Sequence, residues 1–198
     1  MSHVLHAKND RHSMKLEDVE GVVRKLCVSY ALVRRSFIKN ESNINQMLDN
    51  GDLTQAVSAL GKVFHLPPAF RKRVGYNAKK IGPNALAAMH MKVHRFYGVP
   101  VSGHMLFLES KEVALRQPRY RLLHMIAHEL SHARMYLDRH ELATSEFATD
   151  LLAMLVMGNA SDFRTYLNPL GAEYGYVRPS LYDEVFKSME KYYDKIYL

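Results

Sequence analysis

The segment HMIAHELSHARM, residues 124–135, decides how this 198-residue chain is interpreted, because it contains a match to the pattern HExxH. On an α-helix, residues four positions apart lie on one face about one turn apart, so His128 and His132 present their imidazoles together. Two such imidazoles reach a single Zn²⁺ at about 2.0–2.1 Å. Glu129 lies toward the open side of that metal, where it takes a proton from a metal-activated water and delivers it to a leaving amine. The pattern therefore predicts a metal centre on a helix.

The residues around the motif predict that its helix is packed into a core. Pro118 begins a helix-like run that extends to Leu137 and carries a broad apolar surface. Two histidines and a glutamate on such a helix are costly to bury unless they have partners, and a shared metal supplies one. The alternative is a surface helix whose polar groups are solvated.

Zinc needs a third protein ligand beyond the two motif histidines. The downstream candidates are His140, Glu141, Glu146 and Asp150. The run TSEFATDLLAMLVMG, residues 144–158, predicts a second helix with Thr144 or Ser145 as its N-cap. Glu146 then lies in the first turn, where a carboxylate suits the helix dipole, and Asp150 follows one turn later on the same face. There Asp150 can accept the second N–H of a ligand histidine and fix its tautomer.

HExxH followed by ExxxD on the next helix resembles the gluzincin-type zinc metallopeptidases. The nearest patterns are those of the HtpX-like and the ImmA/IrrE-like peptidases, in which the third ligand is a Glu followed four residues later by Asp or Asn. The resemblance covers about residues 96–160. HtpX-like enzymes are usually membrane-embedded, whereas the longest apolar run here, residues 151–158, is far shorter than the roughly 20 residues that span a bilayer.

The resemblance implies a zinc metalloendopeptidase that holds one Zn²⁺ per chain and hydrolyses a protein or peptide substrate. It implies the following roles: His128, His132 and Glu146 as ligands, Glu129 as general base, and Asp150 behind a ligand histidine. It also implies an α+β, mostly helical, zincin-like fold with a small sheet beside the motif helix. In such enzymes the strand before the motif helix pairs with substrate backbone, so we expect the substrate against residues 104–109. An ordinary core strand is the alternative.

A peptidase of this kind needs a donor for the oxyanion of its tetrahedral intermediate. The candidates in the C-terminal part are Tyr166, Tyr174, Tyr176 and Arg178. Tyr174 and Tyr176 are favoured because their loop is rich in Gly and Pro. His124, one turn before the motif, is a further candidate for contact with the cleft or with a ligand, unless it packs against the neighbouring helix.

Composition indicates a globular chain with a substantial core, since 47% of its residues are hydrophobic. The one cysteine, Cys27, excludes an intrachain disulfide and favours a reducing compartment. It falls in an apolar helical run and is expected to be buried and inert. Residues 1–13 contain no apolar signal segment, so we expect a cytoplasmic protein without a membrane span.

Charge is uneven along the chain: residues 1–100 hold 16 Lys and Arg against 7 Asp and Glu, whereas residues 101–198 hold 11 against 13. A basic first half suits nucleic acid, an acidic partner or a membrane surface, and a solvated basic face is the alternative. The densest cluster, Arg71, Lys72 and Arg73, is the candidate for nucleic-acid contact. Two rival functions follow: a non-catalytic zincin-fold regulator, and a nucleic-acid-associated protease that uses the basic half.

The remaining pattern predicts a flexible arm over residues 1–14, a basic helical region over 15–95 and a catalytic core over 96–198, with one continuous domain over 15–198 as the alternative. Helices are predicted over residues 16–40, 53–61, 83–98, 159–167 and 180–198, with turn-rich residues 40–52 after the first. His90 and His94 are spaced i, i+4 in the third of these. A hairpin is predicted over residues 99–110, turning at Ser102-Gly103, with His104 near the start of its second strand.

Overall fold

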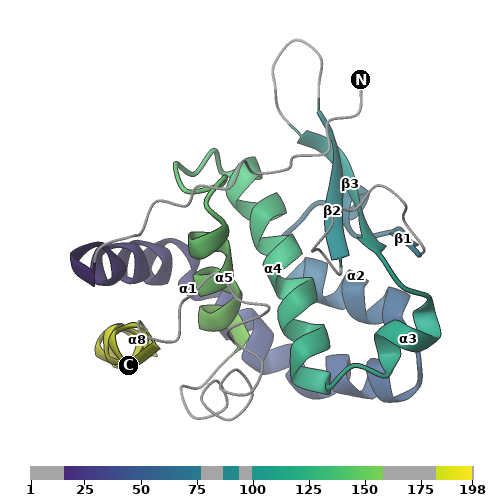
Figure 1. The fold of residues 1–198 in the computed structure, drawn as a ribbon, viewed down its shortest axis with the longest axis horizontal. Helices are drawn as coiled ribbons and strands as arrows, with labels where there is room; N and C mark the ends of the chain where they lie inside the picture. Colours follow the sequence, from purple (N-terminus) through teal and green to yellow (C-terminus); the bar gives the residue numbers. More distant parts are fainter. Residues whose placement is uncertain (1–15, 77–86, 94–99, 158–181, 198) are drawn as a thin grey trace.

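The computed structural model describes residues 16–76, 87–93, 100–157 and 182–197. The helices are α1 (Leu16–Asp49), α2 (Leu53–Val63), the 3₁₀ turn η1 (Pro68–Phe70), α3 (Lys111–Leu115), α4 (Arg119–Leu137), α5 (Glu146–Met157) and α8 (Tyr182–Tyr197). The strands are β1 (Val74–Gly75), β2 (Ala87–Val93) and β3 (Pro100–Phe107). The described chain is α+β and mostly helical, as the sequence predicted, and Figure 1 shows α4 between the small sheet and the helices α1 and α5.

Helix α1 is longer than predicted, because it continues through residues 40–49, which we expected to be a turn. Ile44 and Leu48 are buried and extend the apolar face that Phe37 presents to the core, so tertiary packing outweighs the turn-forming residues around them. The chain turns only afterwards, at Gly51, whose φ of 71° is the left-handed conformation that glycine adopts without strain. Helix α2 then begins after Asp52, whose side chain accepts the N–H of Gln55.

The sheet has the strand order β1-β3-β2, with β1 parallel and β2 antiparallel to β3. This arrangement corrects two predictions. The predicted helix over residues 83–98 is wrong where the structure describes it, because Ala87–Val93 is a strand. The predicted hairpin turn at Ser102-Gly103 is also wrong, because β3 runs straight through it and pairs with β2 along its length.

The physical reason for both corrections is visible in the burial of the strands. Ala87, Met89 and Met91 are buried and alternate with half-buried Ala88 and His90, which is the period of a strand. In β3 the pairing partner of Met91 is Gly103 itself. A side chain at that glycine would collide with the ring of Phe70, so the glycine serves close packing and not a turn.

Helix α5 lies at the centre of the helical layer and is buried on all sides from Ala148 to its end. It packs against α4 on one side and α1 on the other, and α8 packs against α1. Arg34 of α1 donates from Nη1 to the carbonyl oxygen of Val156 at 2.7 Å, so α1 satisfies an unpaired carbonyl at the C-terminal end of α5. The described parts of residues 15–95 and 96–198 thus contribute to one hydrophobic core, across the boundary that we drew near residue 95.

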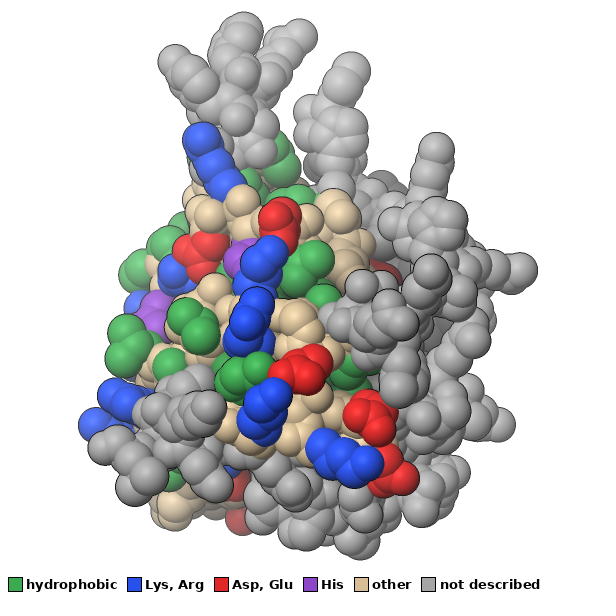
Figure 2. All heavy atoms as spheres, turned by 90° about the vertical axis from the view of Figure 1, so that its left-hand side faces the viewer, with side chains coloured by type: hydrophobic (Ala, Val, Ile, Leu, Met, Phe, Trp, Pro, Cys, Tyr) green, Lys and Arg blue, Asp and Glu red, His purple; other side chains and the backbone are tan. Residues whose placement is uncertain are grey.

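Charges of both signs are mixed on the face drawn in Figure 2, which lies on the left of Figure 1. Lys and Arg side chains form a row there, with Asp and Glu side chains among them. Exposed ion pairs join Lys25 to Glu141 and Lys191 to Glu20. Such exposed pairs contribute little to stability, and acidic side chains interrupt the basic ones among the described residues of this face.

Candidate metal centre

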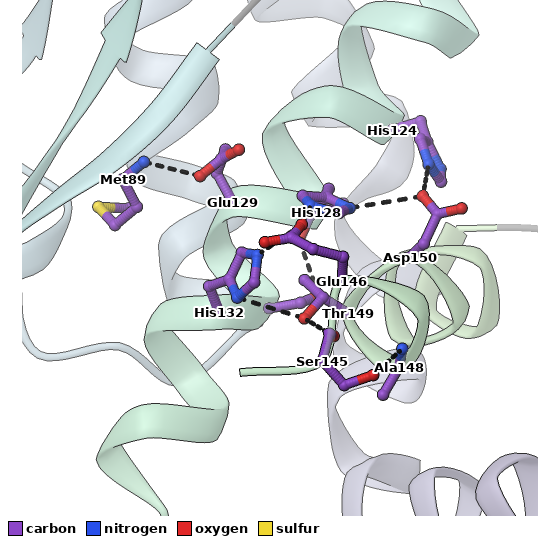
Figure 3. Close-up of polar contacts among 12 residues, drawn as sticks. Met89, His124, His128, Glu129, His132, Ser145, Glu146, Ala148, Thr149 and Asp150 are labelled. Carbon is purple, nitrogen blue, oxygen red and sulfur yellow. Dashed lines mark hydrogen bonds and ion pairs between the residues drawn. The ribbon is translucent and has the colours of Figure 1, made fainter. Parts of the chain in front are cut away.

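Helix α4 carries the HExxH motif, and it begins directly after Pro118 as predicted. Its apolar residues are buried against the sheet and against α5, with Ile126, Ala127 and Leu130 fully inaccessible. This packing directs the side of α4 that carries His128 and His132 toward the start of α5 (Figure 3).

Helix α5 brings its first residue, Glu146, to the two motif histidines. Of the two predicted N-caps, Ser145 is the one that acts, since its Oγ accepts the N–H of Ala148 at 3.2 Å. The backbone carbonyl of Ser145 also accepts the N–H of Thr149 at 3.0 Å, which starts the helical ladder. The position of Glu146 is therefore fixed by the cap that precedes it.

Three side-chain atoms converge at this point. Glu146 Oε2 lies 3.1 Å from Nε2 of His128 and 3.2 Å from Nε2 of His132, and all three atoms lie within 4.8 Å of one another. Two ligands bound to one tetrahedral Zn²⁺ at about 2.0–2.1 Å stand about 3.3 Å apart. The spacing and the donor set, two imidazoles and a carboxylate, therefore fit a zinc site with a fourth position open.

The electrostatics of this cluster keep its carboxylate ionised. Burial alone would raise the pKa of Glu146, but hydrogen bonds from His128 and His132 outweigh burial and lower it to about 2. Burial alone would lower the pKa of His128, but hydrogen bonds to Asp150 and Glu146 outweigh burial and raise it to about 10.

The ring of His132 is held from behind by neutral groups. Its Nδ1 lies 3.2 Å from the carbonyl oxygen of Ala143 and 3.3 Å from Oγ1 of Thr149. The Thr149 hydroxyl donates its own proton to the carbonyl of Ser145 at 2.8 Å, so toward His132 it accepts. Both groups therefore require a proton on Nδ1, so a neutral His132 would carry on Nε2 the lone pair that a metal needs.

The ring of His128 is held from behind by a carboxylate. Asp150 is 2% exposed, and its Oδ1 lies 3.4 Å from Nδ1 of His128 and 2.6 Å from Nε2 of His124. Burial opposes ionisation of Asp150, but the charge and hydrogen bond of His124 and the hydrogen bond of His128 outweigh burial and hold its pKa far below the usual range. Asp150 thus holds a proton on Nδ1 of His128, as the neutral groups do on Nδ1 of His132.

Glu129 points away from this cluster toward the sheet. Its Oε2 accepts the backbone N–H of Met89 at 2.7 Å, and burial raises its pKa although the charges of His128 and His132 oppose the rise. Met89 belongs to β2, which occupies the edge position next to α4. The expectation of a substrate strand against residues 104–109 is therefore wrong about the strand: β3 is the central strand of the described sheet, and β2 provides the edge that faces Glu129.

The other predicted third ligands lie apart from the cluster. Glu141 is exposed and pairs with Lys25, and Nδ1 of His140 accepts the N–H of Leu142 at 3.2 Å. The oxyanion candidates Tyr166, Tyr174, Tyr176 and Arg178 lie outside the described residues, as do the arm over residues 1–14 and the predicted helix over 159–167. His124 contacts Asp150, which lies behind His128, and its contact with the cleft stays a prediction.

Of the three residues in the candidate nucleic-acid cluster, one takes part in packing and two are exposed. Arg71 packs its side chain over Gly61 and donates from Nε to the carbonyl of Leu66 at 3.1 Å, whereas Lys72 and Arg73 are exposed. Contact with nucleic acid stays a prediction for these two exposed residues.

The predicted pair of His90 and His94 is not a helical pair, because His90 lies on β2 and His94 lies outside the described residues. On the outer face of the sheet His90 lies opposite His104, with ring centroids 4.9 Å apart. Cys27 is buried and unpaired as predicted, and burial raises its pKa to about 12.

Sequence reasoning missed several groups that contact the site. Ala143 and Met89 contact the site through backbone groups, and the identity of a residue does not reveal such contacts. Thr149 was detectable, because it lies one turn after Glu146 on the predicted second helix. A further residue, Tyr136, follows His132 by one turn, and burial and then the charge of Glu146 raise its pKa.

Comparison with protein-family models, curated proteins and solved structures gives no match for this chain. Within the described ranges, no helix has both the length and the apolar character needed to cross a membrane. The functional assignment therefore depends on the geometry of the site.

Proposed function

We propose that this chain is a zinc-dependent metallopeptidase with a zincin-like fold. The observation that supports this most directly is the convergence of His128 Nε2, His132 Nε2 and Glu146 Oε2, with an oxygen atom behind Nδ1 of each imidazole. A Zn²⁺ held by these residues would polarise a scissile carbonyl and acidify the attacking water. The cytoplasm suits a chain whose one cysteine is buried and unpaired.

Glu129 is the general base and then the general acid of this proposal. It takes a proton from the attacking water and transfers it to the nitrogen of the departing amine, so that the C–N bond of the peptide breaks with a neutral leaving group. Burial raises its pKa above that of an ordinary carboxyl group, which helps it both to take up the proton of the water and to hold it for the amine. Its hydrogen bond to the N–H of Met89 fixes the carboxylate between the sheet and the ligand cluster.

The substrate backbone adds to β2 in this proposal. The backbone N–H of Met89 points away from β3, since it reaches Glu129 on α4, and the opposite side of β2 is paired with β3. An extended peptide added to the outer edge of β2 therefore runs alongside the base, with alternate side chains on either face of the sheet.

The test starts with the metal. Protein purified without a metal-affinity tag is analysed for zinc as wild type, Glu146→Ala and Glu141→Ala. We expect about one zinc per chain in the wild type and in Glu141→Ala, whose carboxylate lies outside the cluster, and almost none in Glu146→Ala. A wild type that takes up no zinc after reconstitution would overturn the proposal.

The second arm tests the chemistry. Glu129→Gln should retain zinc but lose at least about 100-fold of the wild-type rate, measured by counting new N-termini in a mixture of denatured proteins by mass spectrometry. A zinc-loaded wild type that generates no new N-termini would refute peptide hydrolysis and favour a non-catalytic regulator.

A further inference from the structure

Behind the ligand cluster lies a second group of side chains, formed by His124, His128 and Asp150. The carboxylate of Asp150 stands between the two imidazoles, with Oδ1 at 2.6 Å from Nε2 of His124 and at 3.4 Å from Nδ1 of His128 (Figure 3). His128 belongs to both groups, and it faces one with each ring nitrogen.

The spacing in this second group is that of hydrogen bonds and not of metal ligands. Two atoms bound to one tetrahedral zinc stand about 3.3 Å apart, and the 2.6 Å between His124 and Asp150 is well short of that distance. It is instead a short charge-assisted hydrogen bond. An ionised carboxylate only accepts, so Nε2 of His124 and Nδ1 of His128 both donate to Asp150.

The ring of His124 is itself held in place. Tyr120 lies one turn earlier on α4 and stacks on it, with ring centroids 6.2 Å apart and planes 17° from parallel. The imidazole of His124 is largely buried, with a side-chain exposure of 13%. Its orientation toward Asp150 is therefore set by packing.

This contact also joins the two helices that supply the ligands. His124 lies on α4 and Asp150 on α5, and Asp150 follows Glu146 by one helical turn. Fixing the carboxylate of Asp150 against α4 fixes the turn of α5 that carries Glu146. A displacement of Asp150 would therefore affect two ligands, through the ring of His128 and through the position of Glu146.

We propose that His124 is a positioning residue for the metal centre, which donates a hydrogen bond to Asp150 and through it aligns His128. The inference rests on the proposed zinc site and assigns no contact between His124 and either metal or substrate.

The experiment compares His124→Phe, which keeps a ring for Tyr120 but loses the donor, with His124→Gln, whose amide nitrogen takes the approximate place of Nε2. His104→Phe, at a half-buried histidine on the sheet, is the matched control. Zinc affinity is measured by competition with a chromophoric chelator, and Co²⁺ substitution reports ligand geometry through its visible spectrum. Unfolding of the metal-free proteins shows that each variant is folded.

We expect His124→Phe to weaken zinc binding about 3- to 10-fold and to change the Co²⁺ spectrum, because partners of ligand histidines change metal affinity by about 10- to 100-fold and His124 acts one step further away. His124→Gln and His104→Phe should bind zinc within about twofold of wild type. If His124→Phe does not fold, His124→Asn replaces it, since its shorter amide falls short of Asp150.

A double variant separates positioning from general destabilisation. In an Asp150→Asn background, His124→Phe should cause no further loss of zinc affinity, because its effect passes through Asp150. The inference would be overturned if His124→Phe caused the same loss of zinc affinity in both backgrounds, or if it kept the wild-type affinity and Co²⁺ spectrum. In either case, zinc binding by the wild type would leave the proposed function intact. A wild type without zinc would overturn both.

Discussion

The two motif histidines are supported from behind in different ways. His128 donates to Asp150, a buried carboxylate that is itself held by His124 across the α4–α5 interface. His132 donates to neutral oxygens, the Ala143 carbonyl and the Thr149 hydroxyl. A carboxylate raises the basicity of an imidazole more than a carbonyl does, so the two proposed ligands are not equivalent. In the proposed site, charge would tune the basicity of His128, whereas neutral contacts would only orient His132.

The largest effect is expected at Asp150. Asp150→Asn should weaken zinc binding about 10- to 100-fold, because His128 loses the charged acceptor that selects its tautomer. The metal-free protein should also lose about 3 kcal/mol of unfolding free energy near pH 6, since a buried charge loses its partner. Chelator competition measures the zinc affinity and urea unfolding measures the unfolding free energy. If neither value changed, His128 and His132 would not differ in the way they are supported.

The second effect is a dependence on pH. The raised pKa of His128 stabilises the metal-free fold fully below about pH 6.5, and this contribution is lost as pH rises toward 10. The lowered pKa of Glu146 contributes above about pH 4.5 and is lost as pH falls toward 2. The contribution of the cluster to unfolding free energy should therefore be largest between about pH 4.5 and 6.5.

Zinc binding should show the opposite trend across the neutral range. His128 must release its proton in order to ligate, so zinc affinity should rise by up to about tenfold per pH unit between about pH 6.5 and 9. In Asp150→Asn the steep region should move to lower pH, because a contact that raises the pKa of His128 is gone. A wild-type affinity that does not vary with pH would show that His128 is not protonated in the metal-free protein.

A smaller effect is expected on the neutral side of the site. Thr149→Val removes one of the two acceptors behind His132 and leaves the Ala143 carbonyl, so zinc affinity should fall only about two- to threefold. Unfolding free energy should fall by about 1 kcal/mol, since the hydroxyl also donates to the Ser145 carbonyl. The pH profile of zinc binding should keep its wild-type position, and a loss as large as that of Asp150→Asn would show the two supports to be equivalent.

The smallest effect concerns the start of α5. Ser145→Ala should lower unfolding free energy by about 1 kcal/mol through loss of the N-cap, with zinc affinity within about twofold of wild type. Ser110→Ala is the matched control, because Ser110 caps α3 by accepting the N–H of Val113 at 3.4 Å. Thermal unfolding with and without zinc compares them. A larger loss of zinc affinity than in Thr149→Val would mean that the cap, and not the contacts behind His132, sets the position of Glu146.

The helical part of the site could be predicted because its signals are local. The apolar period of α4, the i, i+4 spacing of its histidines and the cap before Glu146 are each contained within one or two turns of chain. The structure brings the predicted residues His128, His132 and Glu146 together and places Asp150 behind His128, and their roles as ligands and support stay predictions.

The sheet could not be predicted, because its pairing joins segments that are distant in sequence. The stretch around His90 alternates Met with polar residues, a pattern that also contains i, i+4 spacings, and only pairing with β3 decides in favour of a strand. The same limit hides the backbone groups of Met89 and Ala143, whose contacts do not depend on side-chain identity. The sequence did not predict that α1 continues past residue 40, because the residues there favour turns. The burial of Ile44 and Leu48 outweighs that preference.

The contact of Arg34 with the end of α5 bears on which shortened forms of this chain could fold. A shortened version that begins near residue 96 would keep the HExxH motif and Glu146 but would lose Arg34, the whole of α1, and the strand that holds Glu129. Its ligand-bearing helix would expose the face that α1 covers, and the fragment should be insoluble or unstructured in isolation. Library screens and fusion proteins that use this candidate metal centre therefore need the N-terminal helix α1 as an integral part.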